Sequence, residues 1–264
     1  MKFGQTIDRT CVALHAIVIA AVLLSCSSGM PGDRFVGAQN DLKGIEIPHY
    51  ECDEDIVTHL GYVASYNHTT LIPNWVAWEL TAEEVSDAYD FQCSFSRDPI
   101  VDYPKASRED YSNTGWDKGH MAPRADMKWS GQALEESYYF TNICPQHHTM
   151  NSGAWRKIEE LTRRVARRYG NVYVVCGPIV GTGRYGTIGK AGVVVPDAYF
   201  KALAIETETG FQTVGFLVSN DHQDGSPRSY AVSVDSVESV IERNLFPNVA
   251  EEAEKEYEWT VWKN

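Results

Sequence analysis

The sequence lacks an apolar run long enough to cross a membrane comfortably. The longest run extends from about Val12 to Leu24, whereas a membrane-spanning helix needs about 20 predominantly apolar residues. Lys2 and Arg9 precede this run, and positive residues before a short apolar stretch are typical of an export signal. We therefore predict that residues 1–25 are a signal peptide.

The sequence also lacks a Pro/Gly-rich linker that would divide it. The segment from Ser27 to Asn40 contains Ser, Gly and Pro without apolar periodicity, which indicates a tether over residues 26–45. The whole chain is 43% hydrophobic and 22% charged, as is typical of a globular protein that buries its own core. We predict one folded domain over residues 46–264.

Cysteine is scarce, with six residues in the chain, and two of these lie in the signal segment or directly after it. The other four are Cys52, Cys93, Cys144 and Cys176. An oxidising compartment would allow disulfides between them, although the spacing does not give the connectivity. Cys144 and Cys176 lie in apolar, strand-like segments where free thiols are common, so a Cys52–Cys93 bridge is the preferred prediction.

Cys26 directly follows Leu23, Leu24 and Ser25, and this run resembles the cleavage box of bacterial lipoproteins. The resemblance implies that Cys26 becomes the lipidated first residue of an exported protein, anchored to the bacterial envelope on its periplasmic or cell-surface face. The alternative is an ordinary signal peptide with an incidental cysteine.

Motifs of several common site classes are absent. There is no G-x-S-x-G run, which argues against a serine hydrolase. No H-E-x-x-H pattern accompanies His147 and His148, so we expect exposed loop histidines rather than zinc ligands. Residues 181–186 read G-x-G-x-x-G, but the residues after them are glycine-rich and then β-branched, so we predict a loop instead of a dinucleotide site.

Alternating apolar residues predict strands in seven segments. These are residues 62–66, 75–80, 138–142, 172–175, 193–195, 198–205 and 213–218. A capping box of Thr81 and Glu84 predicts a helix that begins at Thr81, and further helices are expected at about 151–169 and 234–244. Because the strands cluster instead of alternating regularly with helices, we predict an α+β fold with a mostly antiparallel sheet flanked by helices.

The most informative segment begins at Asp117-Lys118-Gly119-His120 and continues through Asn142 to a helix with Asn151, Glu159 and Arg163. At about 100° per residue, Asn151 and Glu159 lie about 80° apart, and Glu159 and Arg163 about 40°. The three side chains therefore share one face. The opposite, apolar stripe, which a helix docked on a sheet would bury, consists of Trp155, Ile158, Leu161, Val165 and Tyr169.

Three runs in this segment resemble the signature of the DNA/RNA non-specific endonucleases of the ββα-metal class. They are Asp117-Lys118-Gly119-His120-Met121-Ala122-Pro123, Thr141-Asn142-Ile143-Cys144-Pro145-Gln146, and Asn151-Ser152-Gly153-Ala154-Trp155 with Glu159. The resemblance covers roughly residues 58–248 and includes the runs 74–78, 176–179 and 195–201. It implies an α+β fold with a ββα-metal motif and hydrolysis of phosphodiester bonds.

The chain departs from this family pattern in two places. Lys118 stands where the family more often has arginine, so the positive charge is kept but the planar fork that grips a phosphate is lost. Upstream, where many members have a further phosphate-binding arginine, the chain offers only Arg97 near Cys93. We do not transfer that role to Arg97.

The chemistry of the residues and the resemblance together imply a base and a metal ligand. His120 is the expected general base, because imidazole has an unperturbed pKa of about 6.5. Asn151 is the expected protein ligand of one Mg²⁺, for which Mn²⁺ can substitute, and water fills most other positions. Glu159 would hold those waters, and Asn142 would orient the cluster.

The remaining site residues carry charge. Arg163 and Lys118 would stabilise charge on the phosphate, and Asp117 completes the expected catalytic set. For Asp117 and Asn142 the alternative is that each only orders its loop.

The expected partners are DNA and RNA, although the formal charge of the chain is -13 and such binding depends on Lys and Arg. Residues 156–168 are locally basic, with six basic residues against two acids. The basic residues are Arg156, Lys157, Arg163, Arg164, Arg167 and Arg168. For Arg164, Arg167 and Arg168 the alternative is a merely solvated helix face. A homodimer is one assembly left open.

Two other functions stay open beside a Mg²⁺-dependent, sequence-non-specific endonuclease. The first is a lipid-anchored protein that binds nucleic acid with little turnover, although such a protein would not need His120. The second is a phosphodiesterase for small nucleotides, which only product analysis would distinguish.

Overall fold

The computed structural model describes residues 44–102 and 105–263. The predicted signal peptide, Cys26 and the predicted tether up to residue 43 lie outside the described residues. Among the helices that the structure describes, none has the length and hydropathy needed to cross a membrane.

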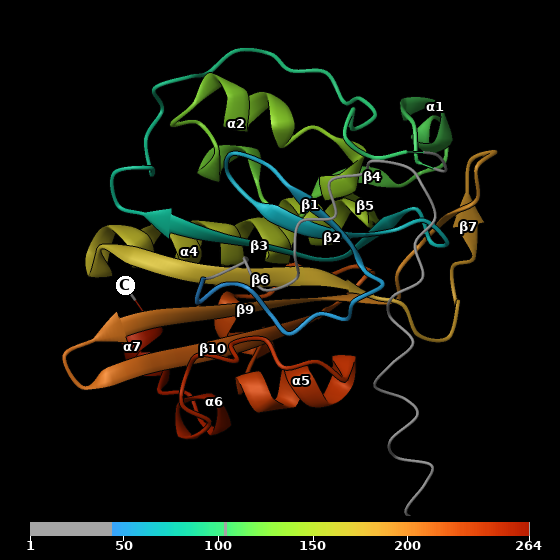
Figure 1. Cartoon of the computed structure of the whole chain (residues 1–264). Coiled ribbons are helices and arrows are strands. Elements are labelled where there is room, and N and C mark those ends of the chain that lie inside the picture. Colours follow the sequence, from blue (N-terminus) through green and yellow to red (C-terminus); the bar gives the residue numbers. More distant parts are fainter. Residues whose placement is uncertain (1–43, 103–104, 264) are drawn as a thin grey trace, which may run out of the picture. The chain divides into compact units, whose positions relative to one another are not determined.

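A seven-stranded sheet forms the centre of the folded unit, with strand order β1-β2-β3-β6-β9-β10-β11 (Figure 1). Its strands are β1 (Asp55–Thr58), β2 (Val63–Asn67), β3 (Ile72–Thr81), β6 (Asn171–Ile179), β9 (Ala198–Thr207), β10 (Gly210–Ser219) and β11 (Ala231–Val232). Every neighbouring pair in this sheet is antiparallel. The predicted α+β fold with a mostly antiparallel sheet is therefore confirmed.

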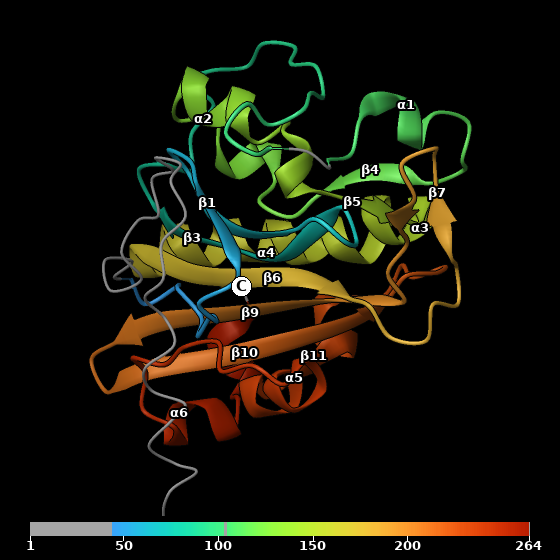
Figure 2. The same cartoon turned by 45° about the vertical axis from the view of Figure 1, so that its right-hand side comes forward.

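The sheet buries an apolar core on each face, because successive side chains of a strand point to opposite faces. On β6, Val174 and Cys176 belong to one core and Val175 to the other. The first core is covered by α4 (Arg156–Tyr169), and the second by α5 (Val234–Ile241) and α6 (Glu252–Lys255). Figure 2 shows α4 and the α5–α6 pair on either side of the sheet.

Shorter elements surround this framework. The remaining helices are α1 (Arg108–Tyr111), α2 (Gly131–Glu136), α3 (His148–Met150) and α7 (Trp259–Trp262), with 3-10 turns η1 (Arg124–Asp126), η2 (Phe140–Asn142) and η4 (Pro227–Tyr230). Two small two-stranded sheets pair β4 (Asp117–His120) with β5 (Ile143–Gln146), and β7 (Thr187–Ile188) with β8 (Val193–Val194).

The long predicted helix exists, but it begins with a π-helical turn, η3 (Asn151–Trp155), that continues into α4. Its predicted apolar stripe is buried against the sheet, with Tyr169 at the edge of that core. The helix predicted at 234–244 ends earlier, at Ile241. Glu242 follows with a positive φ of 55°, which ends the helix with a left-handed residue.

The helix predicted from Thr81 is wrong. The capping box does form, since Thr81 N–H donates to Glu84 Oε2 at 2.9 Å and Glu84 N–H donates to Thr81 Oγ1 at 3.3 Å. The chain continues only as turns, because Tyr89 N–H donates to the Lys128 carbonyl at 2.8 Å and Asp87 pairs with the Lys128 ammonium. These contacts with a distant loop replace the next helical turn.

The strand predicted at 138–142 is also wrong, because residues 140–142 form the turn η2 and β5 begins only at Ile143. Asn142 closes that turn by donating its N–H to the Tyr139 carbonyl at 2.9 Å. The residues 181–186 form a loop, as predicted, and the Asp197 carboxylate holds it by accepting from Thr182 N–H at 2.6 Å.

All four cysteines of the folded unit are free thiols, so the predicted Cys52–Cys93 bridge is wrong. Cys52 is exposed in the turn before β1, and Cys93 lies in an irregular segment of a different loop. Spacing along the chain gave no information on their distance in space. Cys144 and Cys176 are buried free thiols, as expected.

Candidate active site

The residues of the predicted site lie on β4, in the turn η2 directly before its antiparallel partner β5, and on the helix that follows β5 (Figure 2). In the β4–β5 pair, Gly119 is opposite Cys144 and His120 is opposite Ile143. The indole N–H of Trp155 donates to the His120 carbonyl at 3.2 Å. This bond attaches the first turn of the helix to the end of β4.

Gly119 is required by the packing of this pair. A Cβ atom at Gly119 would come within 1.9 Å of Gln146 Oε1 and 2.1 Å of its Cδ. Only the absence of a side chain lets the buried Gln146 amide lie across β4.

Asp117 holds the amide of Asn151 in a fixed orientation. Its Oδ2 accepts from Asn151 Nδ2 and is bonded to His148 Nδ1, each at 2.9 Å. Because the Asn151 nitrogen is thereby assigned to Asp117, its Oδ1 is turned away from that bond and has no hydrogen-bond partner in the described part of the chain. His148 is exposed as predicted, but it begins the helix α3 instead of lying in a loop, and its ring contacts Asp117; His147, before that helix, is half-buried instead of exposed.

Asn142 is completely buried and bonded only to backbone groups. Its Oδ1 accepts from Ala122 N–H at 2.8 Å, and its Nδ2 donates to the carbonyls of Ala122 and Ser137 at 2.9 and 2.8 Å. These bonds fix the loop that leaves β4. The geometry matches the alternative in which Asn142 orders its loop.

The His120 ring packs between aromatic side chains, with ring centroids 5.4 Å from Phe95 and 4.9 Å from Tyr138. Its Nε2 is buried and has no hydrogen-bond partner among the described residues. Burial lowers the pKa of His120 to about 4, and the positive charge of Arg124 acts in the same direction. The imidazole is therefore neutral near pH 7.

Lys118 projects from the same face of β4 as His120, because the two residues are two positions apart. Its Nζ lies 5.4 Å from the centroid of Phe95, the ring that also contacts His120. The strand thus presents a cation and a neutral imidazole that both contact one aromatic ring.

Arg163 lies one turn beyond Glu159 on α4, as the periodicity predicts, and forms an ion pair with Asp126. Its Nη1 is 2.8 Å from Asp126 Oδ1. Asp126 is fully buried, and burial raises its pKa against the attraction of Arg163. A buried carboxylate without this guanidinium would be strongly unfavourable.

Glu159 has a partly buried carboxyl group that makes no hydrogen bond in the described part of the chain. Burial raises the pKa of Glu159 to about 7 against the opposing attraction of Lys201, while the Asp126 charge raises it further. Near pH 7, ionised and neutral forms of the Glu159 carboxyl group therefore coexist in the protein without a bound ion or substrate.

Lys201 is completely buried on β9, and its Nζ has no hydrogen-bond partner among the described residues. The Nζ lies 4.5 Å from the Trp155 ring centroid and 5.1 Å from that of Trp78. Cations bind favourably over the faces of tryptophan rings. Trp155 thus connects the His120 carbonyl with the lysine that attracts Glu159.

A family model for "DNA/RNA non-specific endonuclease" matches residues 44–252. The chain belongs to this endonuclease family. The expected resemblance is therefore confirmed, and the family makes the chain a hydrolase of the nuclease class.

Individual members of the endonuclease family are similar over most of the chain. "Endonuclease G, mitochondrial" of Homo sapiens is 31% identical over 203 residues, which cover 72% of this chain and 68% of that protein. "Nuclease EXOG, mitochondrial" of Homo sapiens is 28% identical over 89% of this chain and 73% of its own length. In the Danio rerio protein of the same name, 35% identity extends over 61% of this chain and about half, 51%, of that protein.

A solved structure of the family has the same fold. The chain superposes on one from "Crystal structure of the EndoG/EndoGI complex: Mechanism of EndoG inhibition" with a TM-score of 0.71 and 28% identity. The match covers 76% of this chain and 89% of the other.

The donor set of the endonuclease site suits a cation that keeps most of its water. Within the part of the chain described, no group of three His, Cys, Asp or Glu ligands converges around β4 and η3. Asn151 Oδ1 is instead a single, oriented oxygen donor. Mg²⁺ is bound in proteins through few side chains and several waters, so the residues fit that ion.

Sequence reasoning missed two charged residues of this site, Asp126 and Lys201. Lys201 had a readable signal, since it is the only charged residue in the apolar run from Ala198 to Ile205. Asp126 lies in the short turn η1, and no periodicity marks it.

Proposed function

We propose that this chain hydrolyses internal phosphodiester bonds of DNA and RNA, with neutral His120 as the general base and Mg²⁺ bound at Asn151. The observation that carries the proposal is the His120 ring, whose Nε2 has no hydrogen-bond partner among the described residues and whose pKa burial lowers to about 4. An imidazole that stays neutral can accept a proton at neutral pH.

Hydrolysis of the phosphodiester requires three changes of bonding. The oxygen of water forms a bond to phosphorus, its proton moves to His120, and the P–O3′ bond breaks with its electron pair on the leaving oxygen. Phe95 and Tyr138 hold the imidazole plane so that the ring does not rotate away. Protonated His120 then returns its proton to solvent, which its low pKa favours.

Asn151 would bind the ion through Oδ1, since Asp117 occupies its Nδ2. A bound Mg²⁺ would neutralise charge on the phosphate and on the leaving oxygen. Glu159, with no hydrogen-bond partner of its own, would accept hydrogen bonds from waters in this space.

Two positively charged side chains, those of Lys118 and Arg163, are proposed to face the substrate. Lys118 is the better placed, because it shares the Phe95 ring with His120 and has no acidic partner in the described residues. Arg163 already donates to Asp126. We predict that its remaining N–H groups contact phosphate, in addition to the bond with the buried Asp126 carboxylate.

Binding without sequence preference would depend on the substrate backbone, which carries charge but no sequence information. The basic face of α4 is smaller than its composition indicates, because Arg156 pairs with Glu160 and Lys157 pairs with Asp224. Arg164 and Arg167 are exposed and have no acidic partner in the described chain. A loss of affinity with rising salt would follow from phosphate contacts.

The experiment is a time course on supercoiled plasmid and on long RNA, with Mg²⁺, with EDTA, and with Mg²⁺ restored. We expect internal cuts in both polymers, loss of activity in EDTA and recovery with Mg²⁺ or Mn²⁺. Asn151→Ala should require far more Mg²⁺, whereas the exposed His222→Ala should behave as wild type.

The same experiment separates the two alternatives. Retention of labelled nucleic acid without products would indicate a binding protein, and hydrolysis of small nucleotide esters alone would indicate a small-molecule phosphodiesterase. Full activity in EDTA would contradict the assignment of Asn151.

The location and assembly are separate proposals. We infer from Leu23-Leu24-Ser25-Cys26 that the enzyme is exported and attached to the bacterial envelope by a lipid on Cys26. A homodimer stays a prediction, for which sedimentation of the soluble domain is the measurement.

A further inference from the structure

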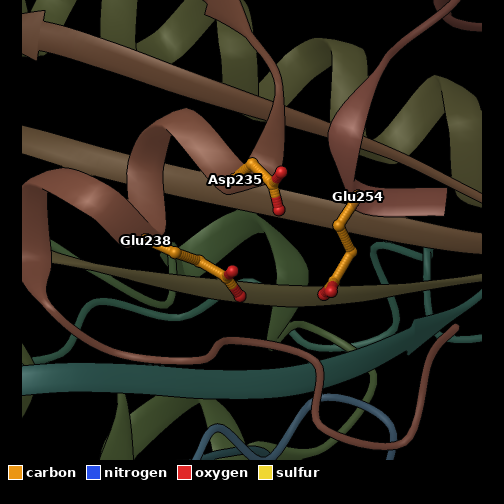
Figure 3. A group of neighbouring side chains, drawn as sticks. All are labelled: Asp235, Glu238 and Glu254. Carbon is orange, nitrogen blue, oxygen red and sulfur yellow. The ribbon is translucent and has the colours of Figure 1, made fainter. Parts of the chain in front are cut away.

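Three carboxylates converge on the face of the sheet opposite α4. Asp235 and Glu238 lie on α5, Glu254 lies on α6, and one oxygen of each is within 4.8 Å of the others. Figure 3 shows the three side chains turned toward a common space between the helices. The separation suits one ion, since ligands on opposite sides of Ca²⁺ at about 2.4 Å each are about 4.8 Å apart.

Glu254 makes this group different from an ordinary acidic surface. Only 3% of the residue is exposed, and its Oε1 is buried without a hydrogen-bond partner among the described residues. A buried carboxylate without a donor is unfavourable. Burial raises the pKa of Glu254 to about 8, and Glu238 and Asp235 act in the same direction.

Among the described residues, none of the three acids forms an ion pair with a protein cation, although Lys255 attracts Asp235 from a distance. The lysine on α6, Lys255, pairs instead with Glu251 at 2.9 Å. Glu238 accepts from Leu245 N–H at 2.7 Å through Oε1, so its Oε2 is left for a ligand. In the part of the chain that the structure describes, the three convergent acids therefore have no cation within ion-pair distance, and Glu254 Oε1 has no hydrogen-bond partner.

We propose that Asp235, Glu238 and Glu254 bind a structural Ca²⁺ ion. Calcium accepts six to eight oxygen ligands in flexible geometry, whereas Mg²⁺ demands a near-ideal octahedron and is usually bound by one or two carboxylates. A site with three carboxylates from two helices therefore favours Ca²⁺. This site is independent of the proposed catalytic ion, because α5 and α6 pack on the other core.

The ion would fasten the C-terminal segment to the sheet. α6 is already attached to β10, where Thr213 Oγ1 donates to the Ala253 carbonyl at 2.6 Å. The same segment continues to Trp262, which is buried in the core on the α4 side. Tyr169 at the end of α4 donates to the Val261 carbonyl at 3.2 Å, so the segment joins both faces.

The test is calcium binding to the intact mature protein with Mg²⁺ present throughout, by equilibrium dialysis and by thermal unfolding. We expect one Ca²⁺ per chain and a higher melting temperature than in EGTA, which removes Ca²⁺ in preference to Mg²⁺. Glu254→Gln should lower the affinity at least about tenfold, because each carboxylate ligand contributes to it. Glu252→Gln, an exposed residue of the same helix, is the matched control and should bind as wild type.

Further variants distinguish the sites. Asp235→Asn should weaken Ca²⁺ binding as Glu254→Gln does, and both should retain nuclease activity with Mg²⁺. In EGTA, Glu254→Gln should melt at or above the wild-type temperature, because a neutral amide replaces a buried carboxyl group whose ionised form Glu238 and Asp235 disfavour. A melting transition at that temperature also shows that the Glu254→Gln variant folds.

Two results would overturn the proposal. The first is wild-type protein that binds no Ca²⁺, in which case the acids hold only a proton or water. The second is binding that survives Glu254→Gln but is lost in Asn151→Ala, which would place the ion at the endonuclease site.

Discussion

At the scale of single residues, Trp155 connects the parts of the endonuclease site. Its N–H donates to the His120 carbonyl, and its ring faces Lys201. The same ring packs 5.6 Å from that of Tyr199, which donates to the Pro145 carbonyl on β5. One side chain therefore links His120, the buried Lys201 and the second strand of the motif.

The first residue prediction concerns the base. His120→Ala should reduce the hydrolysis rate by about 10² to 10⁴, since that is the usual contribution of general base catalysis, while binding of uncut DNA stays unchanged. The measurements are single-turnover cleavage of plasmid and DNA binding in EDTA.

His120→Ala is compared with His222→Ala, an exposed histidine outside the motif. If His120→Ala retained activity within a few-fold of wild type, another group would have to accept the proton.

Lys201 gives a second residue prediction. Its charge favours ionised Glu159, so Lys201→Met should raise the pKa of Glu159 above its present value of about 7. If ionised Glu159 is needed, the acid-side decrease of kcat/KM moves to higher pH in Lys201→Met and disappears in Glu159→Gln. A pH profile that is identical in wild type and Lys201→Met would show that Lys201 has only a packing role.

Acidic pH should also destabilise the fold through His120. Its pKa is about 4 in the folded protein, below its ordinary value of 6.5, so the unfolded chain binds the extra proton as the pH falls from 6.5 to 4. The free energy of unfolding should therefore decrease over this window. His120→Gln should reduce that decrease, as measured by urea midpoints at each pH; an unchanged slope would assign it to other groups.

The residues of the candidate site, and some of their positions relative to one another, were predictable from the sequence. His120, Asn151 and Glu159 stood in recognisable runs, and helical periodicity placed Glu159 and Arg163 together. The ion pair of Arg163 with Asp126 was not predictable, because it joins residues 37 positions apart. A pattern of local spacing contains no information on such a contact.

At the scale of elements, β4 and β5 are held in register by Gly119 and Gln146. Gly119→Ala should destabilise the protein by about 1–3 kcal/mol, because the new methyl group overlaps the Gln146 side chain. Gln146→Ala in the same chain should restore much of the loss, since the buried Gln146 amide has no hydrogen-bond partner in the described residues. Urea unfolding of the double-mutant cycle measures this, and strictly additive effects would exclude the overlap.

The long strands were all predicted, whereas of the short ones β2 and β8 were predicted and β1, β4 and β5 were not, for a physical reason. β3, β6, β9 and β10 have nine or ten residues each, and burial on the sheet gives them a readable alternation. β4 and β5 have four residues each, and their conformation depends on each other and on Trp155. The helix expected after Thr81 failed because Lys128 binds that segment from a distant loop.

At the scale of the whole molecule, the two faces of the sheet carry different chemistry. The α4 face has His120, Asn151 and the buried Lys201, whereas the α5–α6 face has the three convergent acids. The net charge of -13 therefore does not describe the surface that meets the substrate, although it slows the approach of a polyanion at low salt.

The last prediction concerns attachment to a membrane and rests on Cys26. If the lipoprotein interpretation is right, the mature enzyme begins at Cys26 with covalent lipid and enters the detergent phase on phase separation. More than one acyl chain makes such attachment stable, because each buried CH₂ contributes about 0.8 kcal/mol. Cys26→Ser should block processing or release a soluble enzyme with unchanged nuclease activity, whereas Cys52→Ser, at an exposed thiol of the folded unit, should leave the anchor intact. An unmodified mature terminus at any other residue, found by mass spectrometry, would leave an ordinary exported enzyme without a lipid.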